Sequence, residues 1–136
     1  MSSVFWERLD ALLAQSRIVI DRPRGSHHPR FPQIVYEIDY GYLDGTTSTD
    51  GEGVDVWIGS DAARRLDAVI CTVDMDKRDA EMKLMVGCTE AEKSYIERFY
   101  NGWPDMGAIV VRRGSDANSN SDITIYYHNP TTPFVP

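Results

Sequence analysis

The sequence predicts a mainly β domain with peripheral helices, in which short strands form a small barrel. Apolar segments of strand length recur along the 136-residue chain and are separated by turn-forming residues. Helical spacing of apolar residues occurs in only two places, near the N-terminus and again in the second half. The chain shows no internal repeat and no linker. We therefore expect a single domain covering residues 1–136, which is long enough for one hydrophobic core.

The N-terminal part is expected to contain a helix, two strands and a basic loop. Residues 2–16 place apolar side chains on one helical face and begin with serines that suit an N-cap. Residues 17–21 and 33–38 have the composition of strands. Between them, residues 22–32 contain three prolines and three arginines, which excludes regular structure and makes this loop locally basic.

The rest of the chain is expected to contain one clear helix and most of the strands. The predicted strands are residues 54–58, 68–74, 83–87, 107–113 and 123–128. Residues 75–81 form a charged connection of hairpin length. The helix begins after Thr89, because Thr89 and Glu92 have the spacing of a capping box. Gly102 and Pro104 end it.

The charge and hydropathy of the chain limit its partners. A net charge of −7 argues against a general nucleic-acid binder, which needs a basic face to replace counterions. A small anionic substrate remains compatible, because bound metal ions can invert the local charge. No apolar stretch approaches the ~20 residues that span a bilayer. The acidic Glu7 and Asp10 do not fit a signal peptide, so we expect a cytoplasmic protein without a membrane partner.

An acidic stretch in the middle of the chain is the first candidate for chemistry. Asp50, Glu52 and Asp55 lie within six residues, with two glycines between them. Three carboxylates this close repel one another unless a cation lies among them. Mg²⁺ prefers such hard oxygen ligands. Taken alone, however, the stretch fits a solvated acidic turn better than a metal site.

A second acidic cluster favours the metal site. Asp76 and Glu81 flank the charged connection, and Lys83 follows two residues after Glu81. If strands 68–74 and 83–87 pair, these side chains point to the same end of the barrel. Carboxylates with a lysine suit metal ions bridged by a phosphate, whose charge the lysine helps to neutralise.

Five ordered segments of the chain resemble the Mg²⁺-dependent family I soluble inorganic pyrophosphatases. Asp50-Gly51-Glu52-Gly53-Val54-Asp55 is similar to the acidic signature of that family. The other four are Asp21-Arg22-Pro23-Arg24-Gly25-Ser26, Tyr36-Glu37-Ile38-Asp39-Tyr40-Gly41-Tyr42, the spacing of Asp76, Glu81 and Lys83, and Phe99-Tyr100. The resemblance implies an OB-like, five-stranded, twisted β-barrel of the inorganic pyrophosphatase type. It also implies a homo-oligomer.

The resemblance further implies a site with two or more Mg²⁺ ions, or with Mn²⁺ or other hard divalent ions. The metal-binding carboxylates would be Asp50, Asp55, Asp76 and Glu81. Asp55 would bridge two ions, and Glu52 would be the general base that deprotonates the attacking water. These two residues are therefore the implied catalytic pair.

The implied substrate is pyrophosphate, which links the protein to phosphate metabolism. The implied substrate-binding side chains are Arg30, Tyr36, Tyr40, Lys83 and Tyr100. Asp21 would act in the outer shell of the site. The chemistry of the reaction agrees, since metal ions lower the pKa of bound water and cationic and hydroxyl donors stabilise the charged phosphoryl oxygens.

The chain also departs from the family pattern. Glu52 and Glu81 stand where larger members have aspartate, and Arg30 stands for a lysine. The segment between Arg30 and Tyr36 is too short for the usual hairpin, so spacing places no phosphate-binding arginine. Arg24, His27 and His28 are candidates to substitute for it, although no spacing supports them. Our leading hypothesis is Mg²⁺-dependent hydrolysis of pyrophosphate. The alternatives are a hydrolase of a nucleotide or other organic diphosphate, and a metal- and phosphate-binding module with little activity.

Overall fold

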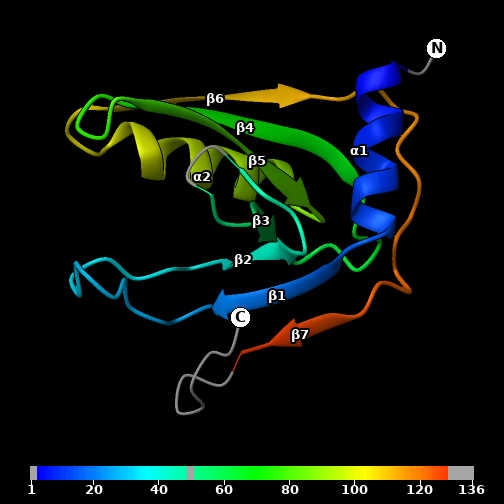
Figure 1. Ribbon diagram of the computed structural model, residues 1–136, viewed down its shortest axis with the longest axis horizontal. Helices are drawn as coiled ribbons and strands as arrows, with labels where there is room; N and C mark the ends of the chain where they lie inside the picture. Colours follow the sequence, from blue (N-terminus) through cyan, green and yellow to red (C-terminus); the bar gives the residue numbers. More distant parts are fainter. Residues whose placement is uncertain (1–2, 49–50, 129–136) are drawn as a thin grey trace.

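A single curled β-sheet organises the computed structural model, which describes residues 3–48 and 51–128 (Figure 1). In chain order the elements are α1 (Val4–Ala14), β1 (Arg17–Arg22), β2 (Asp39–Asp44), β3 (Val54–Ile58), β4 (Leu66–Asp74), β5 (Asp79–Val86), α2 (Glu90–Asn101), β6 (Met106–Arg112) and β7 (Ile125–Tyr127). The seven strands lie in the order β6-β4-β5-β3-β2-β1-β7. The expected mainly β class with peripheral helices is confirmed.

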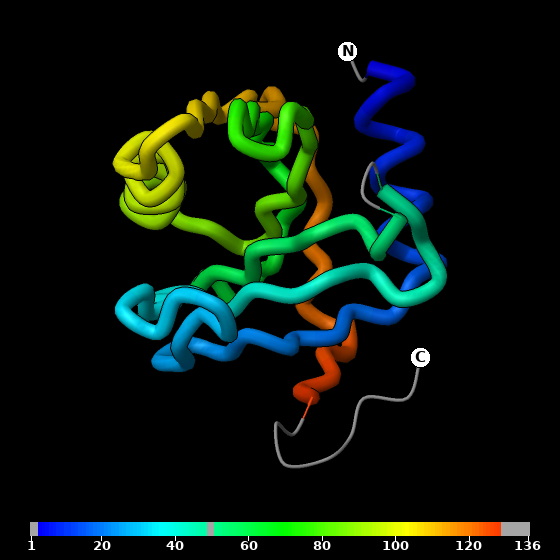
Figure 2. Tube along the Cα trace, turned by 60° about the vertical axis from the view of Figure 1, so that its left-hand side comes forward, coloured from blue at the N-terminus to red at the C-terminus, as the bar shows by residue number. Residues whose placement is uncertain are grey.

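The sheet differs from the expected five-stranded barrel in strand number and in closure. Its five inner strands run in the order β4-β5-β3-β2-β1, and closing them would require β4 to pair with β1. Instead β4 pairs with β6 and β1 pairs with β7, so both of these edges are occupied by added strands. The sheet of the described residues is therefore open. Figures 1 and 2 show it curling from β6 and β4 on one side to β1 and β7 on the other.

Alternation along the strands separates two apolar cores. Val56 and Ile58 on β3 pack in one core with Leu9 and Leu13 of α1. Trp57, between them, points to the opposite face and packs in the other core, which includes Ile96 of α2. Successive side chains of a strand point to opposite faces, so each helix covers its own face of the sheet. The functional side chains described below lie on the α2 face.

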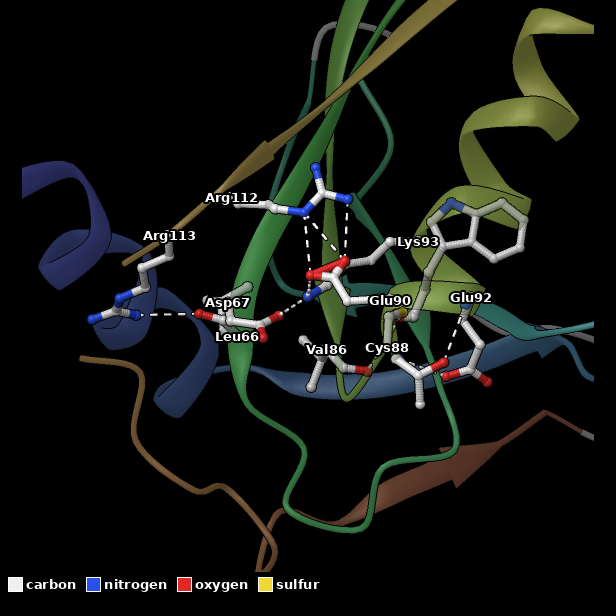
Figure 3. A network of polar contacts seen from close by, with 11 residues as sticks. Leu66, Asp67, Val86, Cys88, Glu90, Glu92, Lys93, Arg112 and Arg113 are labelled. Carbon is white, nitrogen blue, oxygen red and sulfur yellow. Dashed lines mark hydrogen bonds and ion pairs between the residues drawn. The ribbon is translucent and has the colours of Figure 1, made fainter. Parts of the chain in front are cut away.

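A network of charges fixes the N-terminal end of α2 on the sheet (Figure 3). Lys93 is only 4% exposed, and its ammonium lies 3.0 Å from the Asp67 carboxylate and 3.7 Å from that of Glu90. Glu90 in turn accepts hydrogen bonds from the Arg112 guanidinium on β6. The predicted capping box is present: Thr89 accepts from the Glu92 amide and Glu92 accepts from that of Thr89. Together these contacts fix the helix over the second core.

The C-terminal half of α2 covers the free edge of β6. The Asn101 side-chain amide pairs with both backbone groups of Ala108, at 2.8 and 3.1 Å. Glu97 accepts from the backbone amide of Val110 at 2.9 Å. An unpaired strand edge can template aggregation, and these side chains occupy three of the backbone groups along the edge of β6.

The strand predicted at 33–38 is wrong, because this segment contains only an isolated bridge between Val35 and His27, and the strand that pairs with β1 is β2. Within 33–38, the backbone of Tyr36 bonds to that of Gly25 and Ser26 in the basic loop. Tyr36 and Ile38 are buried, which explains their apolar spacing without a strand. Gly41 in β2 permits the close approach of β1, since a Cβ there would lie 1.9 Å from the Val19 carbonyl oxygen.

No helix within residues 3–48 and 51–128 is both long enough and apolar enough to cross a membrane.

Candidate active site

Four polar side chains come together on the α2 face of the sheet. Trp57 on β3 is paired with Tyr40 on β2 and with Met85 on β5. Side chains two residues apart on a strand share a face. Asp55 and Lys83 therefore lie on the same face as Trp57, and Glu81 lies two residues before Lys83. The antiparallel pairing of β4 and β5 that this arrangement requires is present, and the predicted hairpin connection is a turn at residues 75–78.

The Lys83 ammonium is the centre of this group. It lies 2.6 Å from Asp55 Oδ2, 3.0 Å from Glu81 Oε2 and 3.1 Å from the Tyr40 hydroxyl. The residue is only 6% exposed. Burial lowers the pKa of Lys83, but Tyr100, Asp55 and Glu81 outweigh burial and raise it above the ordinary value. Lys83 is thus a fixed cation at neutral pH.

Buried tyrosines surround this cation. Tyr40 and Tyr100 pack their rings against Trp57, with ring centroids 4.7 and 6.0 Å away. Burial raises the pKa of Tyr100 to about 12 and that of Tyr40 well above its ordinary value. Burial also raises the pKa of Tyr36. All three hydroxyl groups therefore stay protonated well above neutral pH and can donate hydrogen bonds.

These residues form the floor of a large open cavity of about 1170 Å³. Most of the residues that the sequence predicts for the site line this cavity. They are Asp21, Arg30, Tyr36, Tyr40, Glu52, Asp55, Asp76, Glu81, Lys83 and Tyr100. Asp50, the remaining expected metal ligand, lies outside the described residues. The folded chain thus brings every described candidate to one cavity, although the role of each remains a prediction.

Arg22 also lines the cavity, although the spacing of residues in the sequence did not identify it as a site residue. Its guanidinium donates to the Tyr36 hydroxyl and lies 5.4 and 5.5 Å from the ring centroids of Tyr36 and Tyr40. The pairing of β1 with β2 shifts between Ile20 and Arg22, which places Arg22 opposite Tyr40. Such a bulge re-aims a side chain. Of the substitutes named from the sequence, His27 and His28 line the cavity and Arg24 does not.

The cavity is also lined by two acids at the end of the β4–β5 hairpin, which the sequence analysis did not identify. Asp74 and Asp79 are paired directly opposite each other where the turn begins and ends. Asp74 Oδ1 accepts from the backbone amides of Asp76 and Lys77, at 2.9 and 3.1 Å. One of its oxygens therefore stabilises the turn. The charged connection in the sequence was the signal that pointed to this cluster.

The described carboxylates of the cavity are the type of donor that a hard divalent cation prefers, but they are not gathered into a metal site. Eight carboxylates line it, against four lysine and arginine side chains. Asp55 and Glu81 direct oxygens to a common point, which the Lys83 ammonium occupies. Oxygen donors of this kind are the ligands of Mg²⁺. In the part of the chain that the structure describes, no three histidine, cysteine or acidic side chains are gathered closely enough to hold a metal ion.

Comparisons with known proteins bear on this site. No curated protein matches the chain. Among solved structures, the inorganic pyrophosphatase of Helicobacter pylori is similar with a TM-score of 0.49 and 16% identity, over 78% of this chain and 85% of that chain. The inorganic pyrophosphatase family model matches residues 17–119, more than half of the 136-residue sequence. This match includes β1 to β6 and the strands that carry the candidate site, so the chain belongs to the inorganic pyrophosphatase family.

Proposed function

We propose that this protein hydrolyses inorganic pyrophosphate to two phosphates with the help of Mg²⁺. The observation that supports this most is the buried Lys83 ammonium, held between Asp55 and Glu81 on the floor of an acid-lined cavity. Phosphoryl transfer needs little covalent chemistry from the protein and depends on positioning and charge stabilisation. A fixed cation beside metal-binding carboxylates supplies both.

The metal ions would be held by carboxylates of the cavity. Asp55, Asp76 and Glu81 are the described candidates, and Asp50 is the fourth expected ligand. Bound Mg²⁺ lowers the pKa of coordinated water and offsets the negative charge of the phosphates. Mn²⁺ or another hard divalent ion offers the same chemistry.

The side chains of the cavity have distinct roles in the reaction. Glu52 accepts the proton of the attacking water as general base. The water attacks one phosphorus, the bond from that phosphorus to the bridging oxygen breaks, and the second phosphate leaves. Lys83 and Arg30 donate N–H groups to the phosphoryl oxygens, where charge accumulates in the transition state.

The neutral hydroxyl groups of the cavity complete the binding of the substrate. Tyr40 and Tyr100 donate O–H groups, and burial keeps both protonated. Tyr36 holds Arg22 against the wall through the contact between its hydroxyl and the guanidinium. Asp21, at the exposed rim, acts outside the inner set of ligands. The homo-oligomeric state, which the resemblance implies, and the cytoplasmic location, which the sequence of the N-terminus suggests, stay predictions.

Phosphate release from pyrophosphate, measured with and without Mg²⁺, tests the proposal. Asp55→Asn removes a charge but keeps the shape, and Lys83 retains Glu81 as a partner. We expect a loss of turnover of roughly 100-fold or more, which is the order seen when one transition-state contact is removed. Asp122→Asn, at an exposed position that does not line the cavity, is the matched control.

Two outcomes would decide against this function. Protein that binds Mg²⁺ but releases no phosphate above background is not a pyrophosphatase. If such protein still binds pyrophosphate, the metal- and phosphate-binding module becomes the better explanation. A trace activity that Asp55→Asn leaves unaltered would point to contamination.

A further inference from the structure

One wall of the cavity is aromatic, unlike the charged floor. A series of rings leads from the fully buried Trp57 to the rim through Phe99, Trp103 and Phe31. Successive ring centroids are 5.8, 6.4 and 5.8 Å apart. Phe31, at the end of the series, is 41% exposed. The cavity therefore combines a polar floor with a set of accessible rings.

The basic loop holds Phe31 at this position. His28 Nδ1 accepts from the backbone amides of Arg30 and Phe31, at 3.0 and 3.2 Å. The Ile34 amide donates to the Phe31 carbonyl at 2.9 Å. The His28 ring lies 5.2 Å from that of Phe31. The backbone thus presents an exposed ring at a fixed place in the cavity wall.

Pyrophosphate alone makes poor use of this cavity. The volume of about 1170 Å³ is above the ~300–1,000 Å³ of pockets that hold drug-sized ligands. Pyrophosphate consists of only two phosphoryl groups and has no planar surface to contact the rings. Stacking on an aromatic side chain favours any ligand with a planar ring, whatever its hydrogen-bonding pattern.

We propose that the cavity also binds and hydrolyses diphosphates that carry a planar aromatic group, with nucleoside diphosphates as the substrate class. The ring would lie against Phe31 and Trp103, and the phosphates would reach the floor at Lys83. Arg30, whose guanidinium carbon is 5.7 Å from the Phe31 ring centroid, also lines the cavity and adds a cation beside the ring. This inference rests on the proposed function, because it uses the same phosphate site.

The reaction balances with water as the only co-reactant. Water attacks the terminal phosphorus, and the bond between that phosphorus and the bridging oxygen breaks. The products are inorganic phosphate, a nucleoside monophosphate and one proton. No oxidant, reductant or second substrate is required.

Binding of non-hydrolysable probes separates the ring from the phosphates. Calorimetry with Mg²⁺ compares the methylene analogue of adenosine diphosphate with methylenediphosphonate, which lacks the ring. We expect the adenosine analogue to bind about tenfold more tightly, from one stacking contact. Phe31→Ala should reduce this ratio of affinities by about the same factor.

Two further variants make the result specific. Phe31→Leu keeps an apolar side chain but not the flat ring, and should lower the ratio as Phe31→Ala does. Phe5→Ala is the matched control, since Phe5 is a 47% exposed ring on α1 that does not line the cavity. Circular dichroism checks that each variant folds.

The outcomes distinguish this inference from the function on which it rests. Equal affinity for the two probes, or a ratio that Phe31→Ala and Phe31→Leu leave unchanged, overturns the ring site while pyrophosphate hydrolysis stands. Absence of binding by both probes also overturns the ring site, and phosphate release from pyrophosphate then decides the proposed function separately. The ring site is supported if the adenosine analogue binds more tightly than methylenediphosphonate, and if the Phe31 variants abolish this difference while Phe5→Ala does not.

Discussion

Replacing Lys83 by methionine tests whether charge holds the floor of the cavity together. Methionine keeps an unbranched apolar stem but removes the ammonium. Lys83 is 6% exposed, and the side chains of its partners Asp55 and Glu81 are 21% and 13% exposed. The variant therefore leaves two half-buried carboxylates facing each other with no cation between them.

The expected loss of stability follows from this geometry. Removing one partner of a buried ion pair costs about 3–5 kcal/mol, because the other charge stays buried and unpaired. Asp55 and Glu81 keep some contact with water, so we expect about 2–3 kcal/mol. For a chain of this length that corresponds to a melting temperature roughly 10 °C lower. Lys77→Met, at an exposed position in the hairpin turn, should change stability by no more than about 0.5 kcal/mol.

Mg²⁺ makes the assay more specific. A divalent cation can replace the missing ammonium between Asp55 and Glu81, so Mg²⁺ should raise the melting temperature of the variant more than that of the parent protein. Turnover should stay low in both conditions, because a donor to the phosphoryl oxygens is lost. Thermal melts and phosphate release, each with and without Mg²⁺, measure the two effects. An unchanged melting temperature would refute the central role given to this cation.

Two other properties of the fold can be tested in the same way. Gly41→Ala places a Cβ 1.9 Å from the Val19 carbonyl oxygen, so we expect a loss of more than ~3 kcal/mol in urea unfolding, whereas Gly114→Ala meets no atom within 4 Å and should be neutral. The second test is pH. The pKa of Lys83 lies above its unfolded value, and burial raises that of Tyr100 to about 12, so both keep their protons in the folded chain after the unfolded chain has lost them. Stability should therefore be complete below about pH 10 and fall as the pH rises toward 12, and flat urea midpoints across this range would contradict the assignment.

Local features of the fold could be predicted from the sequence, because they depend on neighbouring residues. The capping box of Thr89 and Glu92 and the strand at Val54–Ile58 are examples. The pairing of β6 with β4 and of β7 with β1 could not be predicted, because pairing between strands distant in sequence leaves no local pattern. The mistaken strand at 33–38 has a related cause: Tyr36 and Ile38 alternate as a strand does, but the alternation reflects their burial in the second core.

The candidate site was predictable where residue type and spacing suffice. Asp55, Glu81 and Lys83 lie on strands whose alternation and pairing bring them together, and all three line the cavity. Arg22 shows the limit of such reasoning. Strict alternation after Ile20 would place Asp21 opposite Tyr40, and only the bulge places Arg22 there. A bulge depends on the partner strand, so the sequence of β1 alone does not reveal it.

The balance of charge in the cavity connects the carboxylates to the substrate. Eight acidic side chains against four basic ones repel an isolated diphosphate anion, as does the net charge of −7 of the whole chain. Divalent cations invert that balance, because each one brought in by the carboxylates offsets two charges. We therefore expect the metal and the diphosphate to bind cooperatively. Among the described residues of the floor, Lys83 is the one buried cation that is present before either of them binds. Under the proposed function, the excess of acids would favour a metal-bound diphosphate over the free anion.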